Sequence, residues 1–180
     1  MEEVLLIGSL DAGNMEFKPA ALDLRAFVRS LMEEVLSATN RRCPIELSLS
    51  EMPAEIQADE RLLRHIFTNL LTNAIKYSDV GRVVRFEARS TGTEILCTVR
   101  DEGIGIPETD QEWLFTAFHR GRNVYDRPGT GLGLVIVKRC VELHGSKINV
   151  ESKFGEGTSV TVQLPILSRE SRPASASTEK

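Results

Sequence analysis

The chain has 180 residues, of which 41% are hydrophobic, and its formal net charge at pH 7 is -4. This length and composition suit one domain with an ordinary core and leave little room for a second full domain. The mildly acidic charge and the lack of a long basic run argue against nucleic-acid binding, and no apolar stretch approaches the roughly 20 residues that a bilayer span requires. We therefore expect this domain to contact neither nucleic acid nor a membrane.

The cysteines and the N-terminus indicate a cytoplasmic location. Cys43, Cys97 and Cys140 are widely spaced, odd in number and surrounded by apolar residues, which is typical of reduced core thiols. Two glutamates follow Met1 in place of the positive charges of a signal peptide.

The first predicted element is the end of a helix. The apolar residues 4–10 form its last turns, and Gly13 is suited to stop it. A helix this short cannot bury its own apolar face. We therefore expect residues 1–16 to be the end of a longer helix that continues upstream in the parent protein.

Helices and strands then follow in mixed order. Helical spacing of apolar residues, with Asp23 and Asp59 as caps of the first two helices, predicts helices over residues 24–38, 60–77 and 131–144. Alternating apolar and polar residues predict strands over residues 45–50, 83–89, 94–100, 147–152 and 159–164. This order, with its hairpin-like pairs, predicts an α/β two-layer sandwich in which a mixed, mostly antiparallel sheet packs on about three helices.

Residues 107–128 show no sustained periodicity except for a short helical segment over 112–118. A connection this long inside a small domain is usually functional. The tail after Pro165 is rich in Ser, Arg, Pro and Ala, so we expect residues 166–180 to be disordered.

The helix predicted over 60–77 carries two amides and an ammonium on one strip. A rotation of about 100° per residue places Asn73 inside the apolar arc, with Asn69 and Lys76 at its margin. A buried amide needs a partner, and for Asn73 this is either Mg²⁺ on phosphate oxygens or a neighbouring backbone group. Lys76 is either solvated or neutralises phosphate charge.

Asp101 follows a predicted strand and precedes Gly103 and Gly105, which allow the backbone to pass close to a flat ligand. An ionised carboxylate accepts a hydrogen bond from the exocyclic amine of adenine and repels the oxygen that guanine presents there. This predicts ATP over GTP. The alternative is a structural role, in which the aspartate closes a turn.

Two further glycine blocks follow. Residues 129–134 lead directly into an apolar helix, so the free amides of its first turn can face a phosphate, although the lysine and hydroxyl of a P-loop are missing. Residues 155–158 are typical of a hairpin turn. They support a nucleotide site only because they follow the other three blocks in order.

The connection between the glycine blocks holds two aromatic and two basic candidates. Phe115 and Phe118 are spaced to share one face of a short helix, where they either pack in the core or anchor a lid. Arg120 and Arg122 are either solvated or reach phosphate when the lid closes.

In order and spacing, these blocks resemble the catalytic ATP-binding domain of sensor histidine kinases, a Bergerat-type fold of the superfamily that includes DNA gyrase, MutL and Hsp-type chaperones. The resemblance covers roughly residues 16–165. It implies a stub of the dimerisation helix over residues 1–16 and a catalytic domain over residues 17–165. A mobile ATP lid is implied at about 107–130.

The same resemblance implies ATP and Mg²⁺ as cofactors. Residues 69–77 are similar to the family's asparagine box, with Asn73 as the magnesium ligand and Asn69 and Lys76 as its catalytic neighbours, and residues 115–118 are similar to the phenylalanine box. The residues implied to contact ATP are Asn69, Asn73, Lys76, Tyr77, Asp101, Gly103, Gly105, Ile106, Phe118, Arg120, Thr130, Gly131, Leu132, Gly133, Leu134 and Thr158.

One position separates the subfamilies. Hydrolytic members carry a general-base glutamate four residues before the metal-binding asparagine, where this chain has Asn69. An amide cannot take a proton from water near neutral pH, so hydrolysis is disfavoured. Kinases of this family phosphorylate a histidine that is usually followed by an acidic residue, and none of His65, His119 and His144 fits.

The prediction is therefore a protein-histidine kinase catalytic domain. It binds Mg-ATP and donates the γ-phosphate to a histidine on the dimerisation domain of the same parent protein, which forms a homodimer and serves a response regulator in two-component signalling. The alternatives are a nucleotide-gated interaction module without transferase activity and an ATPase clamp, which Asn69 disfavours.

Overall fold

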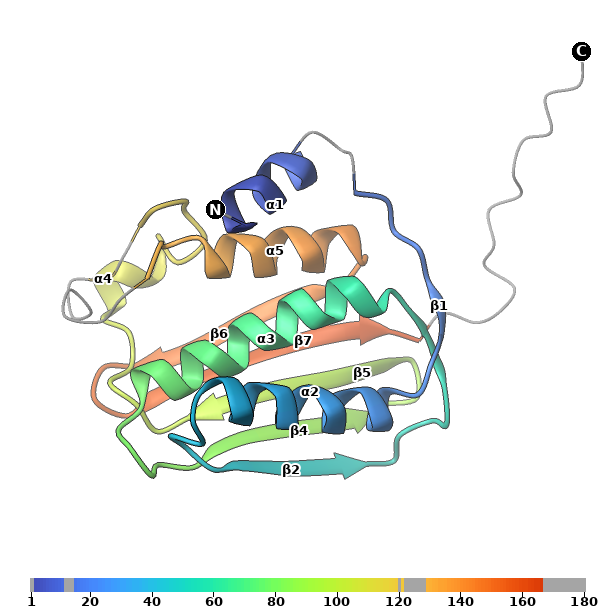
Figure 1. Cartoon of the computed structure of the whole chain (residues 1–180), viewed down its shortest axis with the longest axis horizontal. Coiled ribbons are helices and arrows are strands. Elements are labelled where there is room, and N and C mark those ends of the chain that lie inside the picture. The colour runs from blue at the N-terminus through green and yellow to red at the C-terminus, as the bar shows by residue number, and fades with distance from the viewer. Residues whose placement is uncertain (1, 12–14, 120, 122–128, 167–180) are drawn as a thin grey trace, which may run out of the picture.

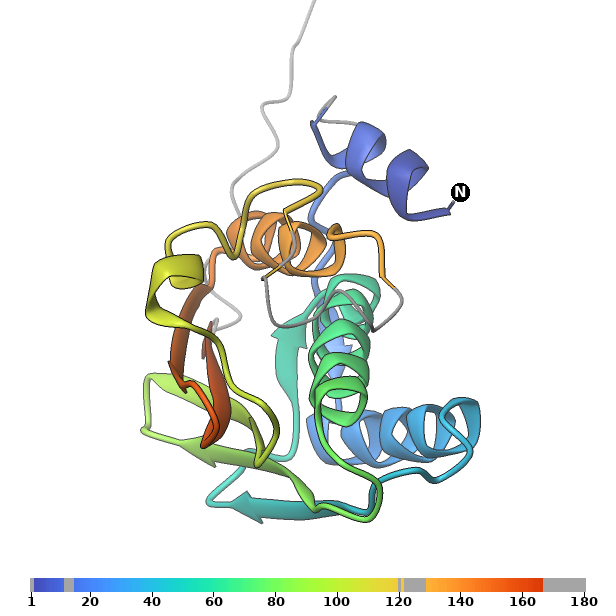
Figure 2. The same cartoon turned by 90° about the vertical axis from the view of Figure 1, so that its left-hand side faces the viewer.

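The computed structural model describes residues 2–11, 15–119, 121 and 129–166. Helices cover one face of a five-stranded sheet, so that the domain has two layers (Figures 1 and 2). The helices are α1 (Glu2–Asp11), α2 (Leu24–Ala38), α3 (Glu60–Tyr77), α4 (Glu108–Gln111) and α5 (Gly133–Leu143). The strands are β1 (Ala20–Leu22), β2 (Ile45–Ser50), β3 (Ile56–Ala58), β4 (Val84–Ser90), β5 (Glu94–Asp101), β6 (Lys147–Lys153) and β7 (Gly157–Pro165).

The main sheet has the strand order β2-β4-β5-β7-β6. Only β2 and β4 are parallel, and the other three pairs are antiparallel. Pairing of β5 with β7 sets Asp101 opposite Thr158, so that two predicted site residues share one end of the sheet. The predicted two-layer sandwich with a mixed, mostly antiparallel sheet is confirmed.

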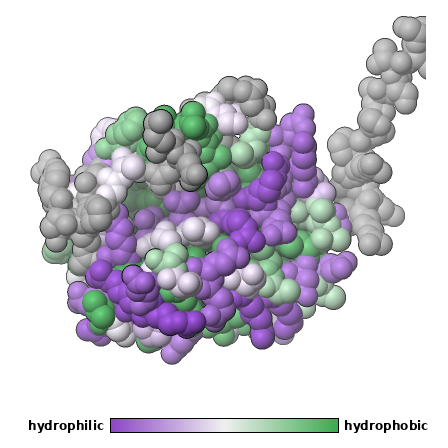
Figure 3. All heavy atoms as spheres, in the orientation of Figure 1, coloured by the Kyte–Doolittle hydropathy of each residue, from purple (hydrophilic) through white to green (hydrophobic). Residues whose placement is uncertain are grey.

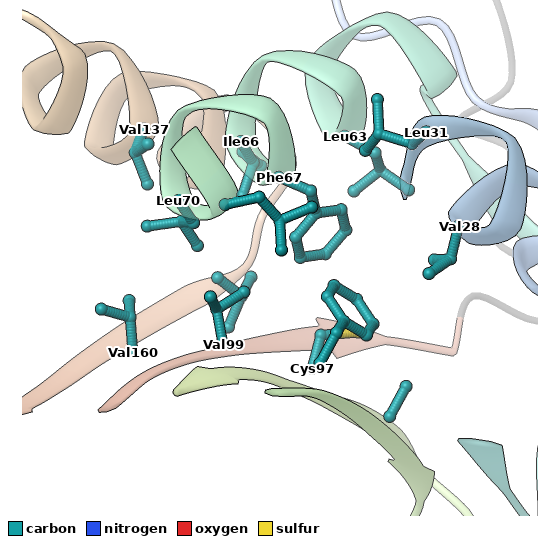
Figure 4. Packing of buried hydrophobic residues seen from close by; sticks show 14 of the residues in the cluster. Val28, Leu31, Leu63, Ile66, Phe67, Leu70, Cys97, Val99, Val137 and Val160 are labelled. Atoms are coloured by element: carbon teal, nitrogen blue, oxygen red, sulfur yellow. The ribbon is translucent and has the colours of Figure 1, made fainter. Parts of the chain in front are cut away.

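The core lies between the helices and the sheet. All eight apolar residues in the predicted arc of α3 are buried, and Figure 4 shows Ile66, Phe67 and Leu70 pointing toward Cys97 and Val99 of the sheet. The three cysteines are free and buried, as predicted. Burial raises the pKa of the Cys97 and Cys140 thiols to about 12, so both are protonated and unreactive at neutral pH.

Several local predictions were wrong. The pairing of β1 with β3 was missed because strands of three residues are too short to show an alternating pattern. The short helix of the 107–128 connection is α4, directly after Pro107, while the residues predicted as helix over 112–118 form successive turns. The third long helix begins at Gly133 and not at Gly131.

The helix α1 lies against α5 at the edge of the domain (Figure 1). Its Leu6 is partly buried against the core, whereas Val4 and Leu5 are exposed, and hydrophobic residues gather over α1 on the face shown in Figure 3. The predicted stop at Gly13 and residues 167–180 of the predicted disordered tail lie outside the described residues. The prediction was wrong for Ile166, whose amide donates to the Thr93 carbonyl and whose side chain packs against the core. In the part of the chain that the structure describes, no helix is both long and apolar enough to cross a bilayer.

A buried polar junction ties the N-terminal segment to α3 and α5. Asp59 caps α3, as predicted, and its carboxylate accepts hydrogen bonds from the amides of Lys18 (2.9 Å) and Arg61 (3.1 Å). The Asp59 amide donates to His144 Nε2 at 3.3 Å, and the His144 ring packs edge-on against Phe17. Burial raises the pKa of Asp59, but the Arg61 guanidinium and these amides outweigh it and hold that pKa below 3.8.

Replacing Asp59 with alanine is expected to lower the free energy of unfolding by about 2–3 kcal/mol, because α3 loses its cap and buried amides lose their acceptor. Urea denaturation measures this loss. The control is Asp23→Ala, which removes the exposed cap of α2 and its bond to the Ala26 amide and should cost about 1 kcal/mol. Since the folded pKa of Asp59 is depressed, its contribution is present above pH 3.8 and is lost as the pH falls further. Equal losses in the two variants would contradict the assigned junction.

Candidate nucleotide site

A cleft of about 360 Å³ opens between α3, the segment around α4, the start of α5 and the ends of β5 and β7. Most of the predicted site residues line it. These are Asn69, Asn73, Lys76, Tyr77, Asp101, Gly105, Ile106, Thr130, Gly131, Gly133, Leu134 and Thr158.

The polar strip of α3 faces this cleft. The side-chain amide of Asn69 donates a hydrogen bond to the His65 carbonyl at 2.8 Å. The Asn73 side chain makes no hydrogen bond within the described residues. The described residues therefore do not show the predicted alternative, a hydrogen bond from Asn73 to a neighbouring backbone group. The Lys76 ammonium lies 2.9 Å from the Tyr77 hydroxyl and above the Tyr77 ring.

The loop before α5 approaches this strip closely at two glycines. A methyl group built on Gly129 would lie 2.5 Å from Lys76 Nζ, and one built on Gly133 would lie 2.8 Å from Asn69 Oδ1. A side chain at either position would therefore displace the Lys76 ammonium or the Asn69 amide from its present place. The cap residue Leu132 has no polar side chain to satisfy the first-turn amides of α5, which are thus available to an anion at the positive end of the helix.

Asp101 stands at the opposite wall, 8% exposed. Burial raises the pKa of its carboxyl group to about 6, although hydrogen bonds from the amides of Gly103 and Thr158 oppose the rise. The carboxylate is therefore mostly ionised at pH 7.5. Gly157, with φ of +106°, allows the β6–β7 turn to pack directly against the Asp101 backbone.

A hydrogen-bond network around Ser152 joins the segment that contains α4 to the β6–β7 hairpin. The Ser152 hydroxyl accepts from the Ile106 amide (2.9 Å), donates to the Gly157 carbonyl (3.0 Å) and lies 2.8 Å from the Thr158 hydroxyl. The Gln111 amide group donates to the carbonyls of Ile106 and Ser152. Ile106 and Gln111 are thereby linked through Ser152 to Thr158, whose backbone amide donates to Asp101.

Some predicted residues do not line the cleft. Leu132 is buried in the core, Phe118 is 70% exposed, and Gly103 packs its backbone against the Tyr77 carbonyl. Arg120 and Arg122 lie outside the described residues. Phe115 is half-buried beneath the Lys138 ammonium, 5.5 Å from its ring centre.

The structure also adds lining residues that sequence reasoning missed. Most are apolar and form walls suited to a flat ring, and without the fold they cannot be told from ordinary core residues. The additional lining residues are Leu70, Thr72, Ala74, Val99, Ile104, Asp110, Leu114, His119, Gly121, Val150 and Val160, whereas Gly129, which also lines the cleft, belongs to the predicted phosphate block.

Comparison with known proteins identifies the family of this chain. Residues 58–168 match the family described as histidine kinase-, DNA gyrase B-, and HSP90-like ATPase. The chain belongs to this family of ATP-binding domains. Within it, the relatives identify the histidine kinase branch, and the chain is a histidine kinase catalytic domain.

Three relatives illustrate the similarity. The circadian input-output histidine kinase CikA of Synechococcus elongatus is 36% identical over 166 residues, which are 87% of this chain and 22% of CikA. The sensor histidine kinase AruS of Pseudomonas aeruginosa is 39% identical over 160 residues, 82% of this chain and 16% of AruS. Full-length ShkA in complex with AMPPNP has a TM-score of 0.79 at 28% identity, covering 91% of this chain and 34% of ShkA. The chain thus spans about a fifth of the length of such curated relatives.

Proposed function

We propose that this domain binds Mg-ATP in the cleft and donates the γ-phosphate to a histidine on the dimerisation domain of its parent protein, in two-component signalling. That domain would form the homodimer and pass the phosphate on to a response regulator. The single observation that carries the proposal is the Asn73 amide, which faces the cleft without a partner among the described residues.

The residues present suit a magnesium ion that is shared with phosphates. No group of three or more His, Cys, Asp or Glu side chains among the described residues could hold a metal. Mg²⁺ rarely needs such a cage, because one or two protein oxygens, water and phosphate oxygens complete its octahedron. Asn73 Oδ1 would supply the protein ligand, and bound Mg²⁺ would neutralise phosphate charge.

The remaining site residues would orient the nucleotide. Lys76 and the first-turn amides of α5 would hold the phosphates, Asp101 would accept from the adenine amine, and the AMPPNP complex of ShkA supports a nucleotide in this kind of domain. Charge neutralisation and positioning would supply most of the catalysis.

Asn69 supports transfer rather than hydrolysis. It lies one helical turn before Asn73 and lines the cleft, so it occupies the place from which a carboxylate would activate water. Its amide has no basicity near neutral pH. The γ-phosphate would therefore persist until a better nucleophile, the imidazole of the acceptor, reaches it.

The test is to incubate the domain with γ-labelled ATP and a separately produced dimerisation domain of the parent protein. We expect label on that domain which is stable to alkali and labile to acid, as phosphohistidine is. The domain alone, and the mixture made with Asn73→Ala, should give none. Tight nucleotide binding without any transfer would instead identify a nucleotide-gated interaction module, and steady phosphate release by the domain alone would identify an ATPase.

A further inference from the structure

His119 carries the one buried side-chain nitrogen or oxygen without a hydrogen-bond partner in the described part of the chain. This atom is Nε2, and the residue lines the nucleotide cleft. A buried imidazole nitrogen without a partner has lost its hydrogen bonds to water and gained none in return, which destabilises the folded state. Such a cost is normally avoided in a native core, so an orphaned polar atom at a ligand cleft points to a ligand.

The backbone before His119 is also strained. Phe118 has φ of +62°, a left-handed conformation that is unfavourable for a bulky side chain and is often retained at functional sites. The strain does not serve packing, because the Phe118 ring is 70% exposed. The strained residue thus leaves its own side chain in solvent and directly precedes His119, which lines the cleft.

Neighbouring groups fix the place of His119 within the cleft. Its backbone carbonyl packs against Gly131, where an added methyl group would lie 2.8 Å from it, and its ring lies 6.3 Å from the Trp113 ring. Gly131 belongs to the loop that passes the Lys76 ammonium and leads into α5. His119 therefore stands beside the phosphate-facing loop and not on β5 or β7, where Asp101 and Thr158 lie.

We propose that His119 Nε2 donates a hydrogen bond to a phosphate oxygen of the bound nucleotide. Phosphate oxygens accept hydrogen bonds only, so the tautomer with the proton on Nε2, or the imidazolium, is the form that binds. His119 is thus a phosphate ligand of the site in addition to the groups assigned above. The inference rests on the proposed role of the cleft as the ATP site and extends it.

The test compares ATP, ADP and adenosine binding to the wild type, His119→Phe and His119→Gln by calorimetry. Phenylalanine keeps a flat ring against Trp113 but cannot donate, and we expect it to weaken ATP binding about tenfold while leaving adenosine binding within about twofold. Glutamine restores an N–H donor and should keep ATP affinity within about threefold of the wild type. Thr109→Val, which changes an exposed hydroxyl on α4, is the control and should bind all three ligands as the wild type does.

Two results would overturn the assignment of His119. One is unchanged ATP affinity in His119→Phe, and the other is an equal loss for ATP and adenosine, which would mean that the ring contacts the base or only supports the lid. Both results apply only if the wild-type domain binds ATP. If the wild type binds no ATP, the proposed function fails instead, so the two failures are distinguishable.

Discussion

Replacing Asn73 with alanine is expected to abolish the magnesium-dependent part of ATP binding. In the wild type, ATP should bind more tightly with Mg²⁺ than with EDTA, because the metal would join the phosphates to the Asn73 amide oxygen. The variant loses that ligand and should bind Mg-ATP at least about 100-fold more weakly, since disturbing even the partners of a metal ligand costs 10–100-fold. Calorimetric titration with ATP in each buffer measures the difference.

The control for this substitution is Asn149→Ala. Asn149 is an exposed amide on β6 that bonds Glu151 away from the cleft, and its loss should leave both titrations unchanged. A wild-type response to Mg²⁺ in Asn73→Ala would exclude the metal role. If the substitution only destabilised the fold, ATP binding in EDTA would weaken as well. A loss that is confined to the titration with Mg²⁺ therefore separates the metal role from a loss of stability.

The second large effect is expected from Asp101→Asn. The carboxylate is buried and would pair with the adenine amine, so its neutral replacement leaves a mismatched amide at a buried position. We expect ATP affinity to fall about 10- to 100-fold and the preference for ATP over GTP to shrink. Glu102→Gln is the matched control, because Glu102 is the adjacent carboxylate but is exposed and pairs with Arg85 outside the cleft.

Asp101 also predicts how binding depends on pH. Its pKa is raised to about 6 by burial, and only the ionised form accepts from the adenine amine. Adenosine affinity should therefore be constant above pH 7 and fall toward tenfold per pH unit below pH 6. Adenosine is the right probe because it has no phosphate that titrates in this range. Asp101→Asn should give a flat profile, and a wild-type profile that stays flat down to pH 5 would contradict the assignment.

The long elements of the fold could be predicted from the sequence because local signals agree there. The helices α2 and α3 have the predicted bounds, since a capping aspartate precedes an uninterrupted apolar stripe in each. The segment over 112–118 contains apolar residues at helical spacing, yet it forms turns, because spacing over two turns is too short a signal to outweigh tertiary context. The strands β1 and β3 depend on pairing across more than 30 residues, which no local pattern encodes.

The candidate site could likewise be predicted from the sequence only in part. Its charged, amide and glycine residues could be predicted because unusual residue types stand at unusual positions, as with Asn73 in an apolar arc. Ser152 and Gln111 could not, because their hydrogen bonds join segments 41 and 46 residues apart. The sequence excludes His119 as the phosphoryl acceptor and offers no other role for it, because the burial of its Nε2 depends on residues distant in sequence.

Trp113 is the chain's single tryptophan. It lies just after α4, 48% exposed, with its ring tilted 38° against His119 at the cleft. Its fluorescence therefore reports on one indole at one place, without any label. Because the emission of an indole depends on its surroundings, the domain carries a built-in optical reporter of any change that nucleotide makes around His119.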